Sequence, residues 1–113
     1  MRIIYNSLIP FKGFAAINLF GVLFVRNGVA VTDRMLNHER IHTAQMREML
    51  YVFFYLWYVA EWLVRIITAM TGHGITGLSA AYHSISFERE AYMNEKYINY
   101  LENRELLKWI EYL

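Results

Sequence analysis

The sequence predicts an α+β fold that is mostly α-helical, with an N-terminal β-hairpin followed by three helices. Two apolar runs rich in Val and Phe, separated by an Asn-Gly pair, predict the hairpin. The absence of Gly and Pro from Asp33 to Met70, and again from Ser84 to Leu113, predicts the helices. A chain of 113 residues has room for one hydrophobic core, so we expect residues 1–113 to form a single domain.

The Asn-Gly pair, Asn27-Gly28, is the strongest two-residue signal for a hairpin, because both central positions of a type I′ turn need positive φ. We therefore expect strands at about 19–26 and 29–32. A stretch with Pro and Gly at 10–13 predicts a loop before the first strand.

The long stretch after the hairpin predicts two abutting helices with a bend near Met49 to Tyr51, since one helix of that length is unusual in a small domain. Thr32 or Asp33 is expected to cap the first helix, its side-chain oxygen accepting an orphan backbone N–H. Three glycines within residues 71–79 then predict a loop. Apolar residues at helical spacing predict a last helix that begins at about Ser84 or Ser86 and runs to the C-terminus.

Residues 51–70 are mainly apolar and carry only two charges, Glu61 and Arg65, and twenty such residues are long enough to span a membrane. Each charge near the middle of a span costs about 2.5–3.5 kcal/mol on insertion. Their i, i+4 spacing also allows the two side chains to pair on one helical face. We therefore expect a mostly buried core helix, and membrane contact through residues 51–70 stays open as an alternative.

Composition narrows the classes of partner. Eleven basic and ten acidic residues give a net charge of +1 without a basic cluster, so we expect no binding to nucleic acid. The chain has no cysteine, which excludes a disulfide scaffold and a thiolate metal site. No signal peptide is evident, so we expect a cytoplasmic or membrane-associated protein. The hydrophobic fraction of 57% also allows a homo-oligomer.

The segment HERIH, residues 38–42, matches the HExxH motif. Four residues are about one helical turn, so His38 and His42 point the same way and can bind one Zn²⁺. Glu39 lies beside that face and can act as a general base on water. The motif lies just inside a predicted helix, which is the context that it requires.

A catalytic zinc site needs a third protein ligand. The downstream candidates are His83, Glu88, Glu90, the glycine-flanked His73 and, with less support, Glu61. We favour Glu88, because Ala91 lies three residues later on the same face and lets two helices approach closely. Glu90 points about 160° away from Glu88 on an ideal helix, so both cannot be ligands together. His83 and Glu90 stay open as alternatives.

HERIH followed by EREA in a later helix resembles the gluzincin branch of the zincin metallopeptidases, in a minimal form similar to small bacterial HExxH proteins. That family's pattern is HExxH with a later E-x-x-A-D, and the match covers residues 33–48 and 84–95. The resemblance implies a zincin-like core and peptide-bond hydrolysis on a peptide or protein substrate. Where many relatives have an Asp that orients a ligand histidine, this chain has Tyr92.

The resemblance also implies a role for individual residues. His38, His42 and Glu88 would be the ligands of Zn²⁺, and Glu39 the base that activates water. Zincins resemble one another in placing an edge strand beside the metal, where an extended substrate can pair, and a strand of the predicted hairpin could serve.

Other residues are candidates for supporting roles. Tyr82, His83 and Tyr92 are candidate donors to the transition state or, alternatively, to a residue that binds the metal. Gln45 and Met46, one turn past His42, are expected to line the site or to pack under it.

The sequence supports three functional hypotheses. The first is a zinc-dependent metallopeptidase. The second is a non-catalytic zincin-like protein in which the metal has a structural or sensory role, and the third is a membrane-associated protein with the metal site near the bilayer. A Glu39→Gln variant separates the first two, since only a catalyst needs that carboxylate.

Overall fold

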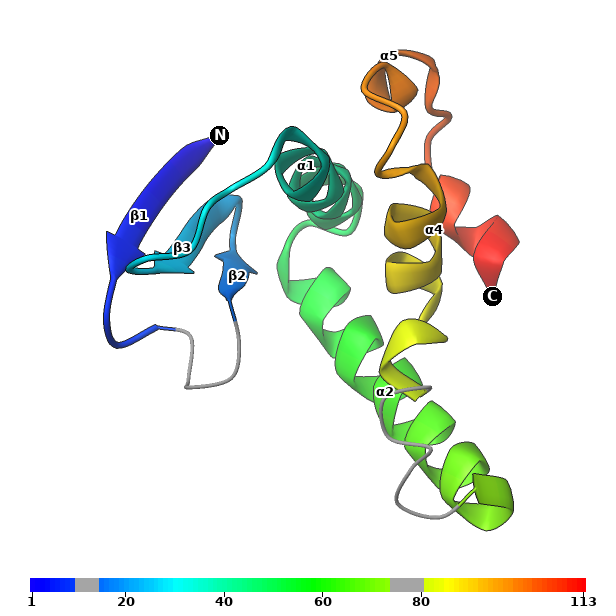
Figure 1. Ribbon diagram of the computed structural model, residues 1–113. Coiled ribbons are helices and arrows are strands. Elements are labelled where there is room, and N and C mark those ends of the chain that lie inside the picture. The colour runs from blue at the N-terminus through cyan, green and yellow to red at the C-terminus, as the bar shows by residue number, and fades with distance from the viewer. Residues whose placement is uncertain (10–14, 74–80) are drawn as a thin grey trace.

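The structure is a computed structural model that describes residues 1–9, 15–73 and 81–113. It has the predicted α+β architecture, mostly α, with a small sheet on one side of a group of helices (Figure 1). Its elements are β1 (Arg2–Asn6), β2 (Ala16–Leu19), β3 (Val22–Arg26), α1 (Asp33–Glu48), α2 (Val52–His73), α4 (Ser86–Asn94), α5 (Tyr100–Asn103) and the 3₁₀ helix η2 (Lys108–Tyr112).

The sheet has the strand order β1-β3-β2, with β1 parallel and β2 antiparallel to β3. A hairpin is present, but the predicted strand boundaries are wrong. Its turn is Phe20-Gly21, between the paired residues Leu19 and Val22, and 29–32 is not a strand. Asn27 lies in the turn that leads from β3 toward α1. The loop expected at 10–13 lies outside the described residues.

Tertiary contacts explain why the turn forms at a position with Phe instead of Asn. Both turn residues have positive φ, 53° for Phe20 and 90° for Gly21, as a type I′ turn requires. The backbone N–H of Phe20 donates to the Tyr55 hydroxyl at 3.0 Å, and its ring lies against Tyr51 and Tyr55, at centroid distances of 6.2 and 5.1 Å. These contacts with α2 and with the bend before it offset the strain of a left-handed Phe.

The predicted pair of abutting helices is confirmed. Thr32 caps α1, its Oγ1 accepting from the backbone N–H of Met35 at 3.1 Å. The chain then bends by 111° between α1 and α2, and Leu50 and Tyr51 both adopt positive φ at the bend. The helices enclose an apolar cluster of Met46, Phe54, Ile85, Phe87 and Trp109.

Helix α2 is only partly what the sequence predicted. Glu61 pairs with Arg65 at 3.5 Å as expected, and it also accepts from the Ser86 backbone N–H and hydroxyl at 2.7 and 2.6 Å. The expectation of a mostly buried helix is wrong, because its outer apolar side chains are exposed. The backbone of residues 71–73 continues the helix, which corrects the start of the predicted loop, and residues 74–79 lie outside the described residues.

In the described part of the chain, no single helix has the length and hydropathy for a membrane crossing. The pair Asp33–Glu48 and Val52–Thr68 meets that test only when its two members are taken together, across the bend.

The single C-terminal helix expected to run to residue 113 is broken into α4, α5 and η2. After α4, the Asn37 amide donates to the backbone carbonyls of Glu95 and Tyr97 at 2.8 and 3.0 Å, so these carbonyls turn toward α1. Leu107 adopts a left-handed conformation with φ of 57° and starts η2. The break brings η2 back against α4, where Trp109 joins the apolar cluster.

Candidate metal centre

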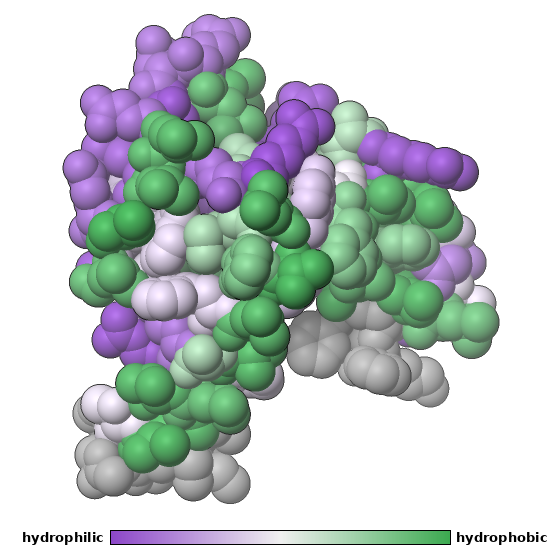
Figure 2. All heavy atoms as spheres, turned by 180° about the vertical axis from the view of Figure 1, so that it is seen from behind, coloured by the Kyte–Doolittle hydropathy of each residue, from purple (hydrophilic) through white to green (hydrophobic). Residues whose placement is uncertain are grey.

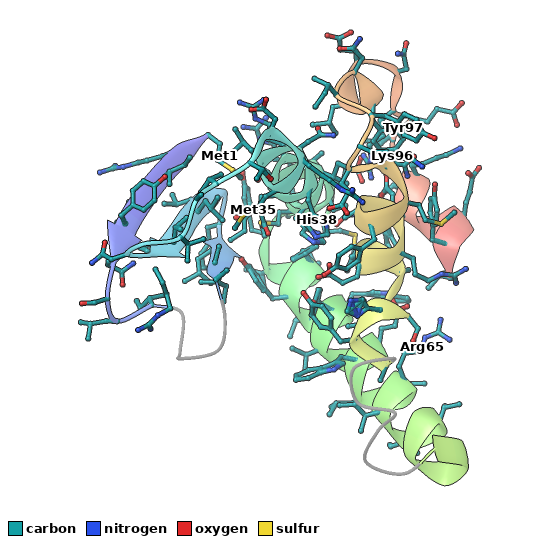
Figure 3. The ribbon with its side chains drawn as sticks, in the orientation of Figure 1. Met1, Met35, His38, Arg65, Lys96 and Tyr97 are labelled. Atoms are coloured by element: carbon teal, nitrogen blue, oxygen red, sulfur yellow. The ribbon has the colours of Figure 1, made fainter. Side chains whose placement is uncertain are left out.

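The two histidines of HExxH lie on the face of α1 that packs against α4. His38 and His42 are one turn apart and both are buried. Ile41 belongs to the buried core, which holds this face of α1 inward. The two helices cross and are in contact, and His38 lies between them (Figures 1 and 3).

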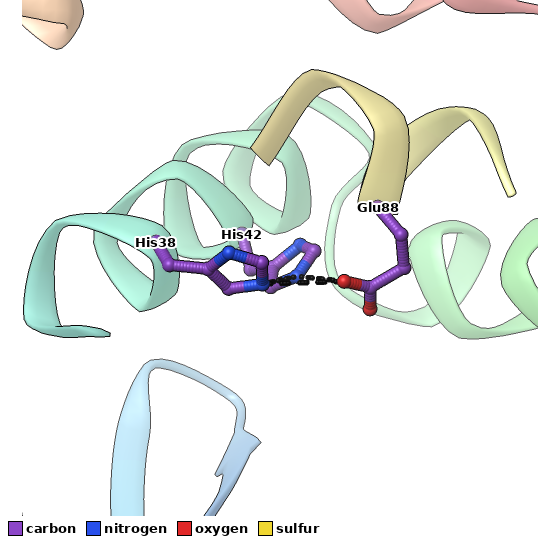
Figure 4. Close-up of side chains that lie close together, drawn as sticks. All are labelled: His38, His42 and Glu88. Carbon is purple, nitrogen blue, oxygen red and sulfur yellow. Dashed lines mark hydrogen bonds and ion pairs between the residues drawn. The ribbon is translucent and has the colours of Figure 1, made fainter. Parts of the chain in front are cut away.

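Glu88 meets the histidines from the first turn of α4 (Figure 4). His38 Nε2 and His42 Nε2 are 3.1 Å apart, and Glu88 Oε1 lies 3.2 and 3.1 Å from them. Three donor atoms thus form a nearly equilateral triangle. Tetrahedral ligands bound at about 2.0–2.1 Å are about 3.3 Å apart, so the triangle has the size that a single Zn²⁺ needs.

The second oxygen of the Glu88 carboxylate is held by Tyr58, a residue of α2 that the sequence did not suggest. The Tyr58 hydroxyl donates to Glu88 Oε2 at 2.7 Å. Because one oxygen is engaged, Oε1 is the atom left to face the histidines. The sequence signal for Tyr58 is weak: it lies on the same side of α2 as the buried Phe54 and Glu61, at i, i+4 and i+7.

The three buried groups form a strongly coupled electrostatic unit. Burial by itself would raise the pKa of Glu88, but the two histidines, His42 first, hold it well below its usual range. Burial would lower the pKa of His42, yet the Glu88 carboxylate outweighs it and raises that pKa to about 9. Without a metal, a proton on His42 therefore balances the Glu88 charge.

A carboxylate outside the predicted motif orients His38. The His38 Nδ1 atom lies 3.0 Å from Glu95 Oε2, and the other Glu95 oxygen pairs with Arg34 at 3.1 Å. This contact is of the kind that the resemblance implied for an Asp at position 92. Glu95 lies seven residues after Glu88, or about two helical turns further along the chain. That spacing is the feature of the sequence that could have placed Glu95 on the same side as Glu88.

Glu39 lines a cleft of about 310 Å³ beside the three converging groups, and His38 lies in the wall of the same cleft. Burial raises the pKa of Glu39, while the neighbouring histidines act in the opposite direction. Tyr82 and Tyr92 also line the cleft, and burial raises the pKa of both phenols, so they keep their protons near neutral pH.

The other predicted candidates lie elsewhere. Glu90 faces away from the histidines and binds Arg104, Tyr100 and Gln45. The His83 ring stacks on Tyr92 at 4.8 Å and is not part of the group of converging donor atoms found among the described residues.

Two further candidates are also accounted for. Glu61 is engaged with Ser86 and Arg65, and the side chain of His73 lies outside the described residues.

Gln45 and Met46 lie beneath the site, as predicted. Gln45 Oε1 is 2.8 Å from His42 Nδ1, and Met46 is a member of the apolar cluster. The site can therefore hold one cation between α1 and α4, with a carboxylate and two phenols beside it.

No protein-family model matches this chain, and neither the curated proteins nor the solved structures contain a match. The chemistry of the centre therefore has to be judged from its own residues.

Proposed function

We propose that this protein is a zinc-dependent metallopeptidase. The observation that carries the proposal is the triangle of His38 Nε2, His42 Nε2 and Glu88 Oε1, with edges of 3.1–3.2 Å, beside a half-buried glutamate that is not itself in the triangle. Three protein ligands are typical of catalytic zinc sites, whereas structural zinc sites usually have four.

When bound, Zn²⁺ supplies a Lewis acid that polarises a scissile carbonyl and makes a water molecule more acidic. Glu39 would accept the proton of that water and pass it to the leaving amine. Its raised pKa suits this exchange, because a base acts best when its pKa is near the working pH. The Tyr82 and Tyr92 hydroxyls, at the cleft wall, would donate to the developing oxyanion.

The edge of the sheet supports a peptide as the substrate. Strand β2 is at one end of the order β1-β3-β2, and its Ala16 lines the cleft together with His38 and Glu39. An extended peptide that pairs with the outer edge of β2 would be led along the cleft. Asn18 of β2 fixes this strand to α1 through bonds to Glu39 O and Thr43 Oγ1, both at 3.0 Å.

Metal content tests the first half of the proposal. Mass spectrometry of protein purified without added metal should find about one zinc per chain in the wild type and in His83→Ala, and less in Glu88→Ala. Absence of metal from the wild type, even after zinc is supplied, would overturn the proposal. Stoichiometric iron would replace the zinc peptidase with an iron centre, because two His and one carboxylate also suit Fe²⁺.

Hydrolysis of a library of fluorescence-quenched peptides tests the second half. Glu39→Gln should keep its zinc and lose about 10²- to 10⁴-fold in rate, the usual contribution of a general base. The exposed neighbour Arg40, changed to Met, serves as the control and should retain activity. Zinc-loaded wild type without activity on any peptide would favour the non-catalytic metal-binding or sensory protein.

The outer face of α2 favours membrane association as a second property. Its exposed apolar side chains are Val52, Phe53, Leu56, Trp57, Val59, Trp62, Leu63, Val64 and Ile67 (Figure 2). Apolar patches beyond a few hundred Å² are rare on monomeric proteins unless they bind something. Over the side chains described in α2, the two charges, Glu61 and Arg65, pair with each other, and Glu61 is turned inward to Ser86.

We favour a lipid bilayer as the partner of this face, because Trp, Phe and Leu along one side of a helix are typical of helices that lie in a membrane surface. The inner face of α2 is occupied by Glu88 and the apolar cluster, so α2 would lie in the bilayer surface and not cross it. The protein would then act beside a membrane.

Vesicle flotation tests this second proposal. The wild type should float with phosphatidylcholine vesicles, and the double variant Leu56→Glu/Leu63→Glu should not. Leu106→Glu, at an exposed leucine outside α2, is the matched control. A wild-type dimer that ignores vesicles and that the double variant dissociates would identify a second copy as the occupant. A non-binding monomer would overturn membrane association.

A further inference from the structure

The Gln45 amide has a single orientation that its surroundings allow. One end of it lies 2.9 Å from Glu90 Oε1 and 3.1 Å from the Phe87 carbonyl oxygen, and both atoms can only accept hydrogen bonds. The NH₂ group must therefore face Glu90 and Phe87. The amide oxygen is left to face His42 Nδ1, at 2.8 Å.

This orientation decides where His42 carries its proton. An amide oxygen accepts and cannot donate, so His42 Nδ1 must carry a proton. Glu88 Oε1, 3.1 Å from His42 Nε2, accepts as well, so the metal-free ring holds a proton on both nitrogens. A metal would replace the proton on Nε2, while the Gln45 oxygen keeps the one on Nδ1. Glu95 has the same effect on His38 through Nδ1.

A buried ion pair between α4 and the chain after it, beside the end of α1, prevents Gln45 from turning over. Glu90 is fully buried, and all of its described partners are donors: Arg104 Nε at 2.5 Å and Nη2 at 3.0 Å, Tyr100 Oη at 2.6 Å, and Gln45 Nε2. The Arg104 guanidinium also pairs with Glu48. Since Arg104 is always charged, Glu90 remains an acceptor on both oxygens.

We propose that Gln45 is a positioning residue for the metal centre, and that the Glu90–Arg104 pair sets it so that His42 presents Nε2 to the metal. This inference rests on the proposed metal site, but it concerns residues that touch no ligand atom of the metal. Groups that orient metal-binding histidines commonly change metal affinity by 10- to 100-fold when they are removed.

The test combines two measurements on the full chain. The first is Co²⁺ titration followed by visible absorption, where Gln45→Met should bind 10- to 100-fold more weakly than the wild type. The second is long-range ¹H–¹⁵N NMR of metal-free protein at pH 10, which reads the tautomer of the neutral His42 ring. In the wild type the neutral ring should divide its proton between Nδ1 and Nε2, because Gln45 and Glu88 both accept, and Gln45→Met should shift it toward Nε2–H.

Two companion variants keep the test decisive. Gln45→Asn retains an amide but is too short to reach His42 and Glu90 together, and it should reproduce both effects if Gln45→Met folds poorly. Arg47→Met places the same new residue on the exposed side of α1 and should change neither reading.

Each outcome has a separate meaning. An unchanged His42 tautomer in both Gln45 variants would overturn the inference, whether or not the wild type binds cobalt. A tautomer shift with unaltered cobalt affinity would overturn the positioning role in metal binding. Failure of the wild type to bind cobalt would overturn the proposed function, and the tautomer shift would still decide whether Gln45 sets His42.

Discussion

Helix α4 carries two buried carboxylates two residues apart, and they have opposite kinds of partner. Glu90 is paired with Arg104, a cation that cannot lose its charge, and its remaining bonds come from Tyr100 and Gln45. Glu88 faces two histidines, whose charge is conditional on protonation, and a tyrosine. One carboxylate is permanently neutralised within the fold, and the other is neutralised only while a proton or another cation is present.

The two kinds of partner indicate two different uses of a buried carboxylate within one helix. The partners of Glu90 cannot be replaced by another cation, so Glu90 stabilises the fold. The charge of Glu88 is balanced by an ion that can be exchanged, so Glu88 is suited to bind a cation. Four predictions test this contrast, from the largest expected effect to the smallest.

Removing the fixed cation should destabilise the protein most. Arg104→Met leaves Glu90 and Glu48 as buried, unpaired carboxylates, and breaking such a pair typically costs about 3–5 kcal/mol. Urea unfolding monitored by circular dichroism should show this loss with and without zinc. The same substitution at the exposed Arg47 should leave the free energy of unfolding nearly unchanged. Equal losses in the two variants would mean that Glu90 is not held by a charge.

Added zinc should stabilise the wild type but not a variant that lacks the Glu88 carboxylate. At zinc concentrations about 100 times the dissociation constant, the wild type should gain about 2.7 kcal/mol of unfolding free energy. Glu88→Ala should gain little at that same concentration, because one of three ligands is missing. Differential scanning calorimetry in chelator and in zinc gives both values, and an equal gain in the two proteins would place the metal elsewhere.

The metal-free protein should lose stability as the pH rises. The folded pKa of His42 is about 9, above its ordinary value of 6.5, so the folded state holds this proton more tightly than the unfolded state. Its contribution is complete below about pH 6.5 and disappears as the pH passes 9, for a total of up to about 3 kcal/mol. Urea titrations in chelator between pH 6 and 9.5 should show the decline, and His42→Gln should lack it.

Zinc should reverse that trend, because metal binding needs His42 without its Nε2 proton and is therefore favoured by higher pH. Stability of metal-free wild type that rises over this range would contradict the coupling of His42 to Glu88.

The smallest effect should come from Tyr58→Phe, which removes one hydrogen bond to the Glu88 carboxylate. Hydrogen bonds to charged groups contribute about 1.5–3 kcal/mol, and Glu88 keeps its contacts with the histidines. Zinc affinity measured by competition with a chromophoric chelator should fall by about tenfold. The matched control is Tyr97→Phe, at an exposed tyrosine on the chain after α4, which should bind zinc as the wild type does.

Local signals predicted the parts of this molecule that depend on local physics. Thr32 as a cap, the bend between α1 and α2 and the HExxH face each follow from spacing along a helix. Glu88 could be predicted because Ala91 is fully buried one turn away and permits close packing of the helices.

Contacts between distant segments decided the rest. The turn moved to Phe20-Gly21 because Tyr55, thirty-five residues later, binds the Phe20 backbone. The C-terminal helix broke after α4 because Asn37 holds the carbonyls that follow it. Tyr58 and Glu95 reach the centre through packing that no short window of sequence contains.

Helix α4 begins without a side-chain cap of its own, since Ile85 provides none and Glu61 of α2 accepts from the Ser86 backbone N–H instead. The hydrogen bond between Tyr58 and Glu88 is a second link between the same two helices, which the two links join in antiparallel register. These two hydrogen bonds fix the position of Glu88 along α2, and neither of them involves the segment that connects α2 to α4. A longer connection would therefore leave both bonds in place, and lengthening it by a factor of two costs only about 0.6 kcal/mol of closure entropy. An insertion between Tyr58 and Glu61, by contrast, would displace Glu88 from the histidines.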